Sequence, residues 1–226
     1  MPTQKLRIRF TKTGDLRLTG HLDLARAWER LFRRAGVKLV MSGGFHPRPK
    51  IHFPSALAMG EAGTDEVVDV EIERDEIEEF PSEVRNVSGG EPSDIACGSL
   101  LALLRQVAPG GLLPTAIEEL PHDAPTATAR EVDYEFPLPR EWQAEVTGRV
   151  ERLLAQPSLW VERREKRAVD MRSYLLDAGV EEGQLRFRLR VAREGSLRAR
   201  DVLSALSLAE LQESGSFATR TSVRLT

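Results

Sequence analysis

Two segments of this chain alternate strictly between apolar and charged side chains, and no other feature constrains the fold as much. In residues 5–12 (KLRIRFTK), Leu6, Ile8 and Phe10 point one way, and Lys5, Arg7 and Arg9 point the other. Residues 184–192 (QLRFRLRVA) repeat the pattern. A period of two is typical of a strand with one buried face and one open face. The chain is therefore expected to build sheets that are covered on one side.

The elements around these strands are predicted in the same order twice, on either side of a linker at 121–130 (PHDAPTATAR). In the first half we expect strands at 5–12, 37–42, 65–73 and 112–120, and helices at 21–36 and 93–108. In the second half we expect strands at 131–139, 159–165, 184–192 and 217–225, and helices at 140–157 and 196–207.

This repeated β-α-β-β-α-β order is that of the ferredoxin-like sandwich, an antiparallel sheet with two helices on one face. The prediction is an α+β protein of two tandem ferredoxin-like domains, at 1–122 and 130–226. Thr19 is the expected N-cap of the first helix, and Leu22 is placed on its apolar stripe. Residues 74–93 are polar and are expected to form a loop.

The net charge of −3 conceals a segregation of charge along the chain. Residues 1–60 carry 12 Lys and Arg against 3 Asp and Glu, whereas residues 61–130 carry 4 against 16. A basic first quarter indicates an anion-binding face. The alternative is that the two blocks neutralise each other on folding, and the sequence assigns no role of its own to the acidic segment 61–94.

The cysteine content and the hydropathy exclude several classes of protein. The single cysteine, Cys97, excludes an intramolecular disulfide, a zinc site of several cysteines and an iron–sulfur cluster held by this chain. There is no apolar run of 18 residues, and the first ten residues lack the apolar region of a secretory signal. We expect a cytoplasmic protein that has no membrane partner and holds no metal or cofactor.

The first helix carries the strongest candidates for anion binding, Arg26, Arg30, Arg33 and Arg34, at spacings that place them along one side. They form either a stripe that tracks phosphates or a solvated helix face. The arginines of the alternating strands have a different expected role. Carboxylates on neighbouring strands favour cross-strand ion pairs over ligand contacts; these carboxylates are Asp69, Glu71, Asp133 and Glu135.

The loop after the first helix, SGGFHPRPKIHFPS at 42–55, is the second candidate site. Gly43 and Gly44 permit unusual backbone angles, and Pro47 and Pro49 stiffen the second half of the loop. The loop is expected to present an aromatic ring, a histidine and two cations, which suit base stacking, phosphate binding or the gripping of a partner protein. These residues are Phe45, His46, Arg48 and Lys50.

Acid–base chemistry is a third possibility, and its candidates are His21, Asp23 and His46, if the helix start and the loop meet. No Ser-His-Asp order, phosphate-binding loop motif or metal signature accompanies them. His21 and Asp23 are two residues apart and do not face each other on a regular helix. The alternative is that both residues serve only the start of the helix.

Several segments resemble a bacterial family of radical SAM-linked proteins. The resemblance lies in residues 6–36, 42–60 and 65–72, with weaker similarity at 169–175 and 219–225. It implies a cobalamin-binding radical SAM partner that carries the iron–sulfur cluster, S-adenosylmethionine and cobalamin, since this chain has no CxxxCxxC motif. The family has no established catalytic residues to transfer to this chain.

The expected function is that of an accessory protein that contacts structured RNA, in tRNA or rRNA modification by the radical SAM partner. One alternative is a metal-independent endoribonuclease, because CRISPR repeat-processing endoribonucleases are similar in architecture. The other is a pure protein-interaction module that docks the radical SAM protein.

Overall fold

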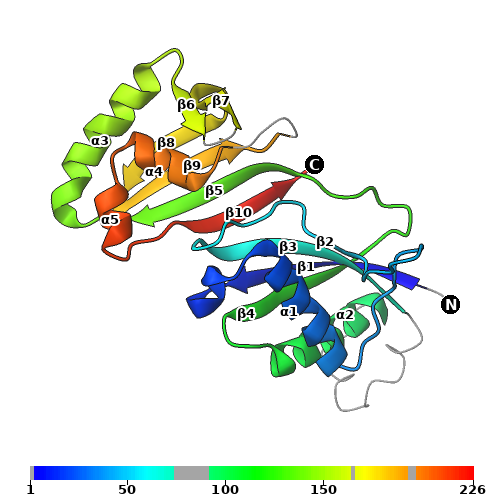
Figure 1. The fold of residues 1–226 in the computed structure, drawn as a ribbon. Coiled ribbons are helices and arrows are strands. Elements are labelled where there is room, and N and C mark those ends of the chain that lie inside the picture. Colours follow the sequence, from blue (N-terminus) through cyan, green and yellow to red (C-terminus); the bar gives the residue numbers. More distant parts are fainter. Residues whose placement is uncertain (1–2, 74–91, 164–165, 193–196) are drawn as a thin grey trace. The chain divides into compact units, whose positions relative to one another are not determined.

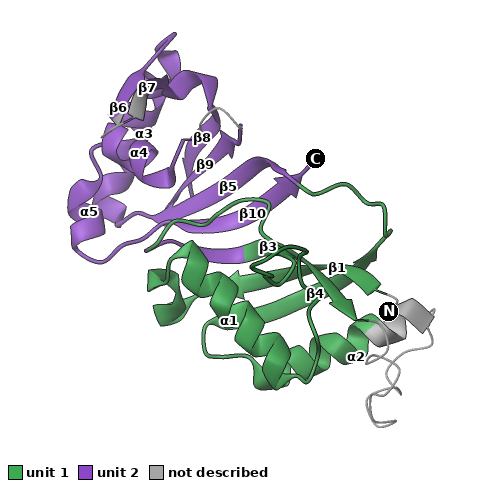
Figure 2. Ribbon diagram, turned by 45° about the vertical axis from the view of Figure 1, so that its right-hand side comes forward, with its two compact units in different colours: residues 1–59, 65–127 green, residues 60–64, 128–226 purple. Residues whose placement is uncertain are grey.

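The computed structural model describes residues 3–73, 92–163, 166–192 and 197–226, and it is of mixed α+β type (Figure 1). It divides into two compact units: unit 1 comprises residues 1–59 and 65–127, and unit 2 comprises residues 60–64 and 128–226 (Figure 2). The expected linker is therefore divided between them, and residues 60–64 join the second unit. The loop expected at 74–93 lies outside the described residues, apart from its last two, in which a helix begins.

Unit 1 contains a sheet whose strand order is β4-β1-β3, with β2 paired to β3. Strands β1 and β4 are antiparallel, as are β2 and β3. Figure 1 shows α1 and α2 on the same face of this sheet. The elements are β1 (Thr3–Lys12), η1 (Gly14–Leu18), α1 (His21–Arg34), β2 (Ile51–His52), β3 (Ala62–Glu73), α2 (Pro92–Val107) and β4 (Leu112–Leu120).

The core of unit 1 follows from the alternation in β1. Leu6, Ile8 and Phe10 are completely buried, whereas the charged residues between them are only partly buried. Phe10 meets Trp28 of α1 edge to face, with ring centroids 5.1 Å apart. Full burial of each such side chain contributes about 1.5–3 kcal/mol to the free energy of folding. The alternation and the amphipathic helix are thus confirmed, and they fix which side of α1 faces solvent.

Two details of the first helix were predicted wrongly. Gly20, not Thr19, is the N-cap of α1, because the Thr19 hydroxyl donates to the Leu16 carbonyl and closes η1 instead. Leu22 is 69% exposed. The buried stripe starts at Leu24, and a residue two positions away on a helix lies on nearly the opposite side.

The strand expected at 37–42 is also wrong. This segment forms only isolated bridges, Leu39 to Ile72 and Met41 to Pro49, and the second strand is the short β2. Pro47 and Pro49 have no backbone N–H to donate, so the ladder beside them is interrupted.

Unit 2 contains a sheet with strand order β10-β5-β9-β8, and its successive pairs are antiparallel. Ala62 and Gly63 pair in parallel with the start of β10. A separate hairpin joins β6 and β7. The elements are β5 (Ala129–Pro137), α3 (Arg140–Ala155), β6 (Trp160–Arg163), β7 (Lys166–Asp170), η3 (Met171–Ser173), β8 (Leu175–Glu181), β9 (Gln184–Arg190), α4 (Ala199–Ala205), α5 (Ala209–Glu213) and β10 (Thr219–Leu225).

The neighbour of β9 is not the strand expected at 159–165, whose described part forms β6 and pairs with β7. It is β8, whose sequence LLDAGVE contains Asp, Ala and Gly, residues that are depleted in strands. The connection to β9 accounts for the pairing. Glu182 and Gly183 both have positive φ, 51° and 77°, as a tight two-residue hairpin requires.

Candidate anion-binding surface

Helix α1 presents a row of guanidinium groups to solvent because its opposite side is buried in the core of unit 1. Arg26, Arg30, Arg33 and Arg34 are all exposed. Arg26 donates to Asp23 over 3.2 Å, but both side chains are more than half exposed, so the pair is weak. Across the residues that the structure describes, no carboxylate pairs with Arg30, Arg33 or Arg34. Their charges are available to a ligand.

The segment 42–48, which we call the Phe45 loop, is closed at its base. The Ser42 amide donates to the Arg48 carbonyl over 2.7 Å, and the Arg48 amide donates to the Ser42 hydroxyl over 3.0 Å. Gly44 has a φ of 107°, which a side chain would strain. The loop holds Phe45 fully in solvent, at 103% exposure, with His46 and Arg48 also exposed.

Lys50 differs from the other cations of this region. Its ammonium group donates to Glu71 of β3 over 2.5 Å. It therefore pins the end of the loop segment to the sheet, and its charge is already partly neutralised. Arg48, in contrast, has no carboxylate partner in the described ranges of the chain.

The cations on the open face of the unit 1 sheet have partners. The sequence predicts Asp69 correctly, whereas Glu71, the other carboxylate expected to pair with them, pairs with Lys50 instead. Arg7 donates two hydrogen bonds to Asp69, at 2.9 and 3.0 Å, and this contact raises the pKa of Arg7. Arg9 donates to Asp65 over 2.6 Å. Lys5 donates to the Ala124 carbonyl, which holds the end of unit 1 against the sheet. These charges stabilise the fold and are not free for phosphates.

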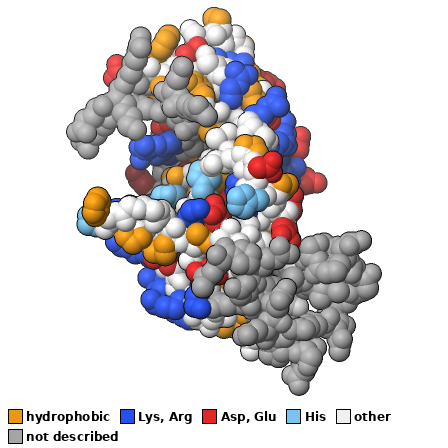
Figure 3. Space-filling view, turned by 90° about the vertical axis from the view of Figure 1, so that its right-hand side faces the viewer, with side chains coloured by type: hydrophobic (Ala, Val, Ile, Leu, Met, Phe, Trp, Pro, Cys, Tyr) orange, Lys and Arg blue, Asp and Glu red, His pale blue; other side chains and the backbone are white. Residues whose placement is uncertain are grey.

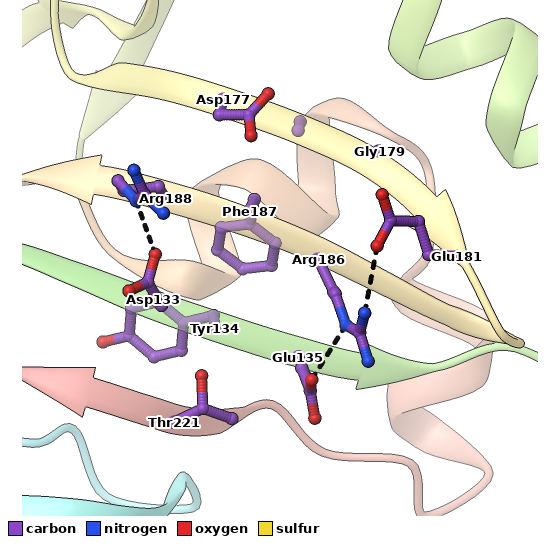
Figure 4. Close-up of a pocket in the computed structure, with 11 residues that line it drawn as sticks. Asp133, Tyr134, Glu135, Asp177, Gly179, Glu181, Arg186, Phe187, Arg188 and Thr221 are labelled. Atoms are coloured by element: carbon purple, nitrogen blue, oxygen red, sulfur yellow. Dashed lines mark hydrogen bonds and ion pairs between the residues drawn. The ribbon is translucent and has the colours of Figure 1, made fainter.

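The sheet of unit 2 repeats this arrangement around a hollow of about 410 Å³. Figure 4 shows Arg188 reaching Asp133, at 2.6 Å, and Arg186 lying between Glu135 and Glu181, at 2.9 and 3.0 Å. The hydrogen bond to Glu135 is the largest cause of a raised pKa at Arg186. More carboxylates than guanidinium groups line the hollow, so it does not suit an anion.

Arg220 and Arg224 differ in exposure although an even spacing of four would place them on one face of a regular strand. Arg220 is 1% exposed, whereas Arg224 is exposed and pairs with Glu131 and Asp133. The register of β10 against β5 shifts between Arg220 and Ser222. A β-bulge of this kind changes the alternation of side chains along a strand.

The candidates for acid–base chemistry have separate contacts. The His21 ring packs edge-on against Phe53, with centroids 5.1 Å apart, and Asp23 accepts from Arg26. His46 is exposed in the Phe45 loop. Figure 3 shows histidine, hydrophobic and Lys or Arg side chains close together on one face. Within the described part of the chain, no hydrogen bond or ring contact joins any two of His21, Asp23 and His46. No three His, Cys, Asp or Glu residues of that part form a metal-binding group.

Comparison with known proteins identifies a family. Residues 5–200 match the family described as an uncharacterized protein conserved in bacteria, DUF2344. The chain belongs to this family. The DUF2344 match includes α1 and the Phe45 loop, so the unpaired arginines lie within the family region.

Other comparisons add little. No curated protein matches the chain. Among solved structures, the small subunit of acetolactate synthase from Thermotoga maritima is similar at 10% identity, covering 100% of this chain and 97% of that one, with a TM-score of 0.24. A likeness at this TM-score does not establish a common fold. No helix in the described parts of this DUF2344 protein is long and apolar enough to cross a membrane.

One residue of the surface was missed by the sequence analysis. Ser42 closes the Phe45 loop through its amide and its hydroxyl. A serine directly before two glycines is a signal for such a turn, because serine hydroxyls bond to nearby backbone groups.

Proposed function

We propose that this chain is an accessory protein that contacts structured RNA through α1 and the Phe45 loop. The observation that carries the proposal is a contrast between two sets of arginines. One set lies on the sheets and is paired with carboxylates: Arg7, Arg9, Arg186, Arg188 and Arg224. The other set is exposed and, in the ranges described, has no such partner: Arg30, Arg33, Arg34 and Arg48. Unpaired cations gain most from a polyanion, because each neutralised phosphate releases counterions.

The surroundings of these arginines support an anionic ligand. Residues 31–60 contain five Lys or Arg and no Asp or Glu. A ligand with many negative charges therefore meets no repulsion from carboxylates of this segment. The proposal includes no acid–base step, since no contact joins His21, Asp23 and His46.

The proposed partner is a cobalamin-binding radical SAM protein in the cytoplasm, which would supply the iron–sulfur cluster, S-adenosylmethionine and cobalamin. The single cysteine of this chain is too few to hold the cluster. The expected result is that the two proteins co-purify from lysate treated with ribonuclease. Loss of the partner protein under those conditions would contradict a direct partnership.

We also propose that the chain forms two ferredoxin-like domains, at 1–122 and 130–226. The strand orders β4-β1-β3-β2 and β10-β5-β9-β8 support this, since each places the first and last strands of its half side by side. The second half then carries the β6–β7 hairpin as an insertion.

Reversal of two charges on α1 tests the proposed RNA contact. Arg30→Glu/Arg34→Glu is expected to weaken binding to bulk tRNA by about tenfold or more and to lower the salt slope of log K by about two, one for each lost phosphate contact. The measurement is fluorescence anisotropy across a salt series. Both side chains are exposed, so the fold is expected to persist.

A matched control is Arg140→Glu/Arg152→Glu on α3, which changes the net charge equally at exposed positions of unit 2. This variant is expected to retain most of its affinity. Equal losses in the two variants would mean that net charge alone, and not α1, determines binding.

A further inference from the structure

We infer that the RNA bound by unit 1 carries an unpaired base that stacks on Phe45, so that the ligand is single-stranded or looped rather than fully paired. The inference rests on the proposed function and specifies its ligand. It is carried by Phe45 and by the way the Phe45 loop holds this ring.

Phe45 is the most exposed large hydrophobic residue that the structure describes. Its exposure is 103%, compared with 71% for Met59 and 69% for Leu22. A ring in this position contributes nothing to the core and is open to a ligand or partner, which would gain free energy by covering it. A single exposed hydrophobic residue needs no explanation by itself. The inference therefore depends on the closed loop that holds the ring and on the cations beside it.

The loop reduces the conformational cost of using this ring. The two hydrogen bonds between Ser42 and Arg48 close its base, and Pro47 fixes one backbone angle within the tip. The bridge between Met41 and Pro49 continues the closure. A ligand that covers Phe45 therefore does not need to order the loop first, and more of the contact energy remains for affinity.

The charges around Phe45 favour a nucleobase over an apolar protein pocket. His46 and Arg48 lie one and three residues after Phe45 in the chain, and both are exposed. Residues 31–60 contain no Asp or Glu. A nucleotide supplies both an aromatic face for Phe45 and a phosphate for Arg48, the combination by which proteins hold single strands. An apolar pocket would satisfy the ring but would leave the cations without partners.

Paired RNA does not offer the same contact. In an A-form duplex the bases stack on each other, and proteins reach mainly the phosphates and the 2′-hydroxyl groups. Phe45 is therefore expected to contribute only where bases are unstacked. The exposed arginines of the proposed RNA contact, by contrast, are expected to bind the phosphates of both forms of RNA; these are Arg30, Arg33, Arg34 and Arg48.

The test compares two RNAs with nearly equal numbers of phosphates, a single strand and a blunt duplex of half its length. Phe45→Ala is expected to weaken binding of the single strand by about 5- to 150-fold, the range for loss of one base–aromatic stack. Binding of the duplex and both salt slopes are expected to stay unchanged. The control Leu113→Ala removes a 46%-exposed side chain from β4 and is expected to change neither affinity.

A second variant reports stacking directly. Phe45→Trp is expected to keep the affinity for the single strand, and the added indole emission is expected to be quenched on binding. The duplex is expected to leave that emission unchanged.

The outcomes separate this inference from the proposed function. If Phe45→Ala changes the affinity for neither RNA, or lowers both affinities equally, the inference of stacking is wrong. The proposed phosphate contact still holds in that case, provided that Arg30→Glu/Arg34→Glu lowers the affinity for both RNAs. If the unaltered protein binds no RNA at low salt, both proposals fail. If a protein from ribonuclease-treated lysate binds the unaltered chain but not Phe45→Ala, the ring binds a pocket on that protein. The inference of a stacked base would then be wrong.

Discussion

Gly111→Ala is expected to lower the free energy of unfolding of unit 1 by roughly 3 kcal/mol or more, the sum of backbone strain and overpacking. Gly111 has a φ of 83°, and a Cβ atom there would lie 2.4 Å from the Thr13 carbonyl oxygen. It would also lie 3.0 Å from the Leu16 Cβ. The backbone cannot simply withdraw, because the Thr13 amide donates to the Gly111 carbonyl over 2.8 Å.

The control for this variant is Gly110→Ala, one residue earlier in the chain. A Cβ atom at Gly110 meets nothing within 4 Å, and its φ lies outside the left-handed region. We expect a change within about 0.5 kcal/mol there. Hydrogen exchange of the β1 amides in urea measures the stability of unit 1 in both variants. Equal exchange in the two would show that the contact between residues 13 and 111 is not needed.

Arg7→Met is expected to destabilise unit 1 by about 3 kcal/mol, the lower end of the cost of leaving a buried charge unpaired. Asp69 is only 4% exposed and accepts both of its hydrogen bonds from Arg7, which is 18% exposed. Methionine fills a similar volume but donates nothing, so the carboxylate loses its counter-ion without regaining water. The same exchange measurement on β1 reports the loss.

Two further variants show whether the unpaired charge is the cause. Arg9→Met breaks a pair whose side chains are 40% and 32% exposed, and we expect a loss below about 1 kcal/mol. Arg7→Met/Asp69→Leu removes both charges and is expected to recover most of the stability. If the double variant is no more stable than Arg7→Met, packing of the Arg7 stem rather than charge explains the effect.

Periodicity was sufficient to predict most elements because it depends only on neighbours in the chain. The alternation of β1 and of β9 predicted their buried faces, and the pairing of their arginines with Asp69 and Asp133 followed from charges on adjacent strands. Strand β8 was missed because its exposed, Ala- and Gly-containing sequence shows no strong period. Its place comes from the tight turn at Glu182 and Gly183.

The candidate site was predicted as a set of cations on one helix and one loop, and the structure places all of them at the surface. The sequence could not show that Lys50 is held by Glu71 while Arg48 has no described carboxylate partner, because that depends on residues 21 positions away. It also could not show how completely Phe45 is exposed.

The order of amino acids was enough to predict the strand and helix periodicity, the segregation of charge and the membership of a bacterial family. Three features became visible only in the folded chain: which charges are paired and which stay available, which strand lies beside β9, and why residue 111 must be glycine. All three have one cause. A side chain's own periodicity is local, whereas its partner, its burial and its steric limits are set by segments distant in the chain.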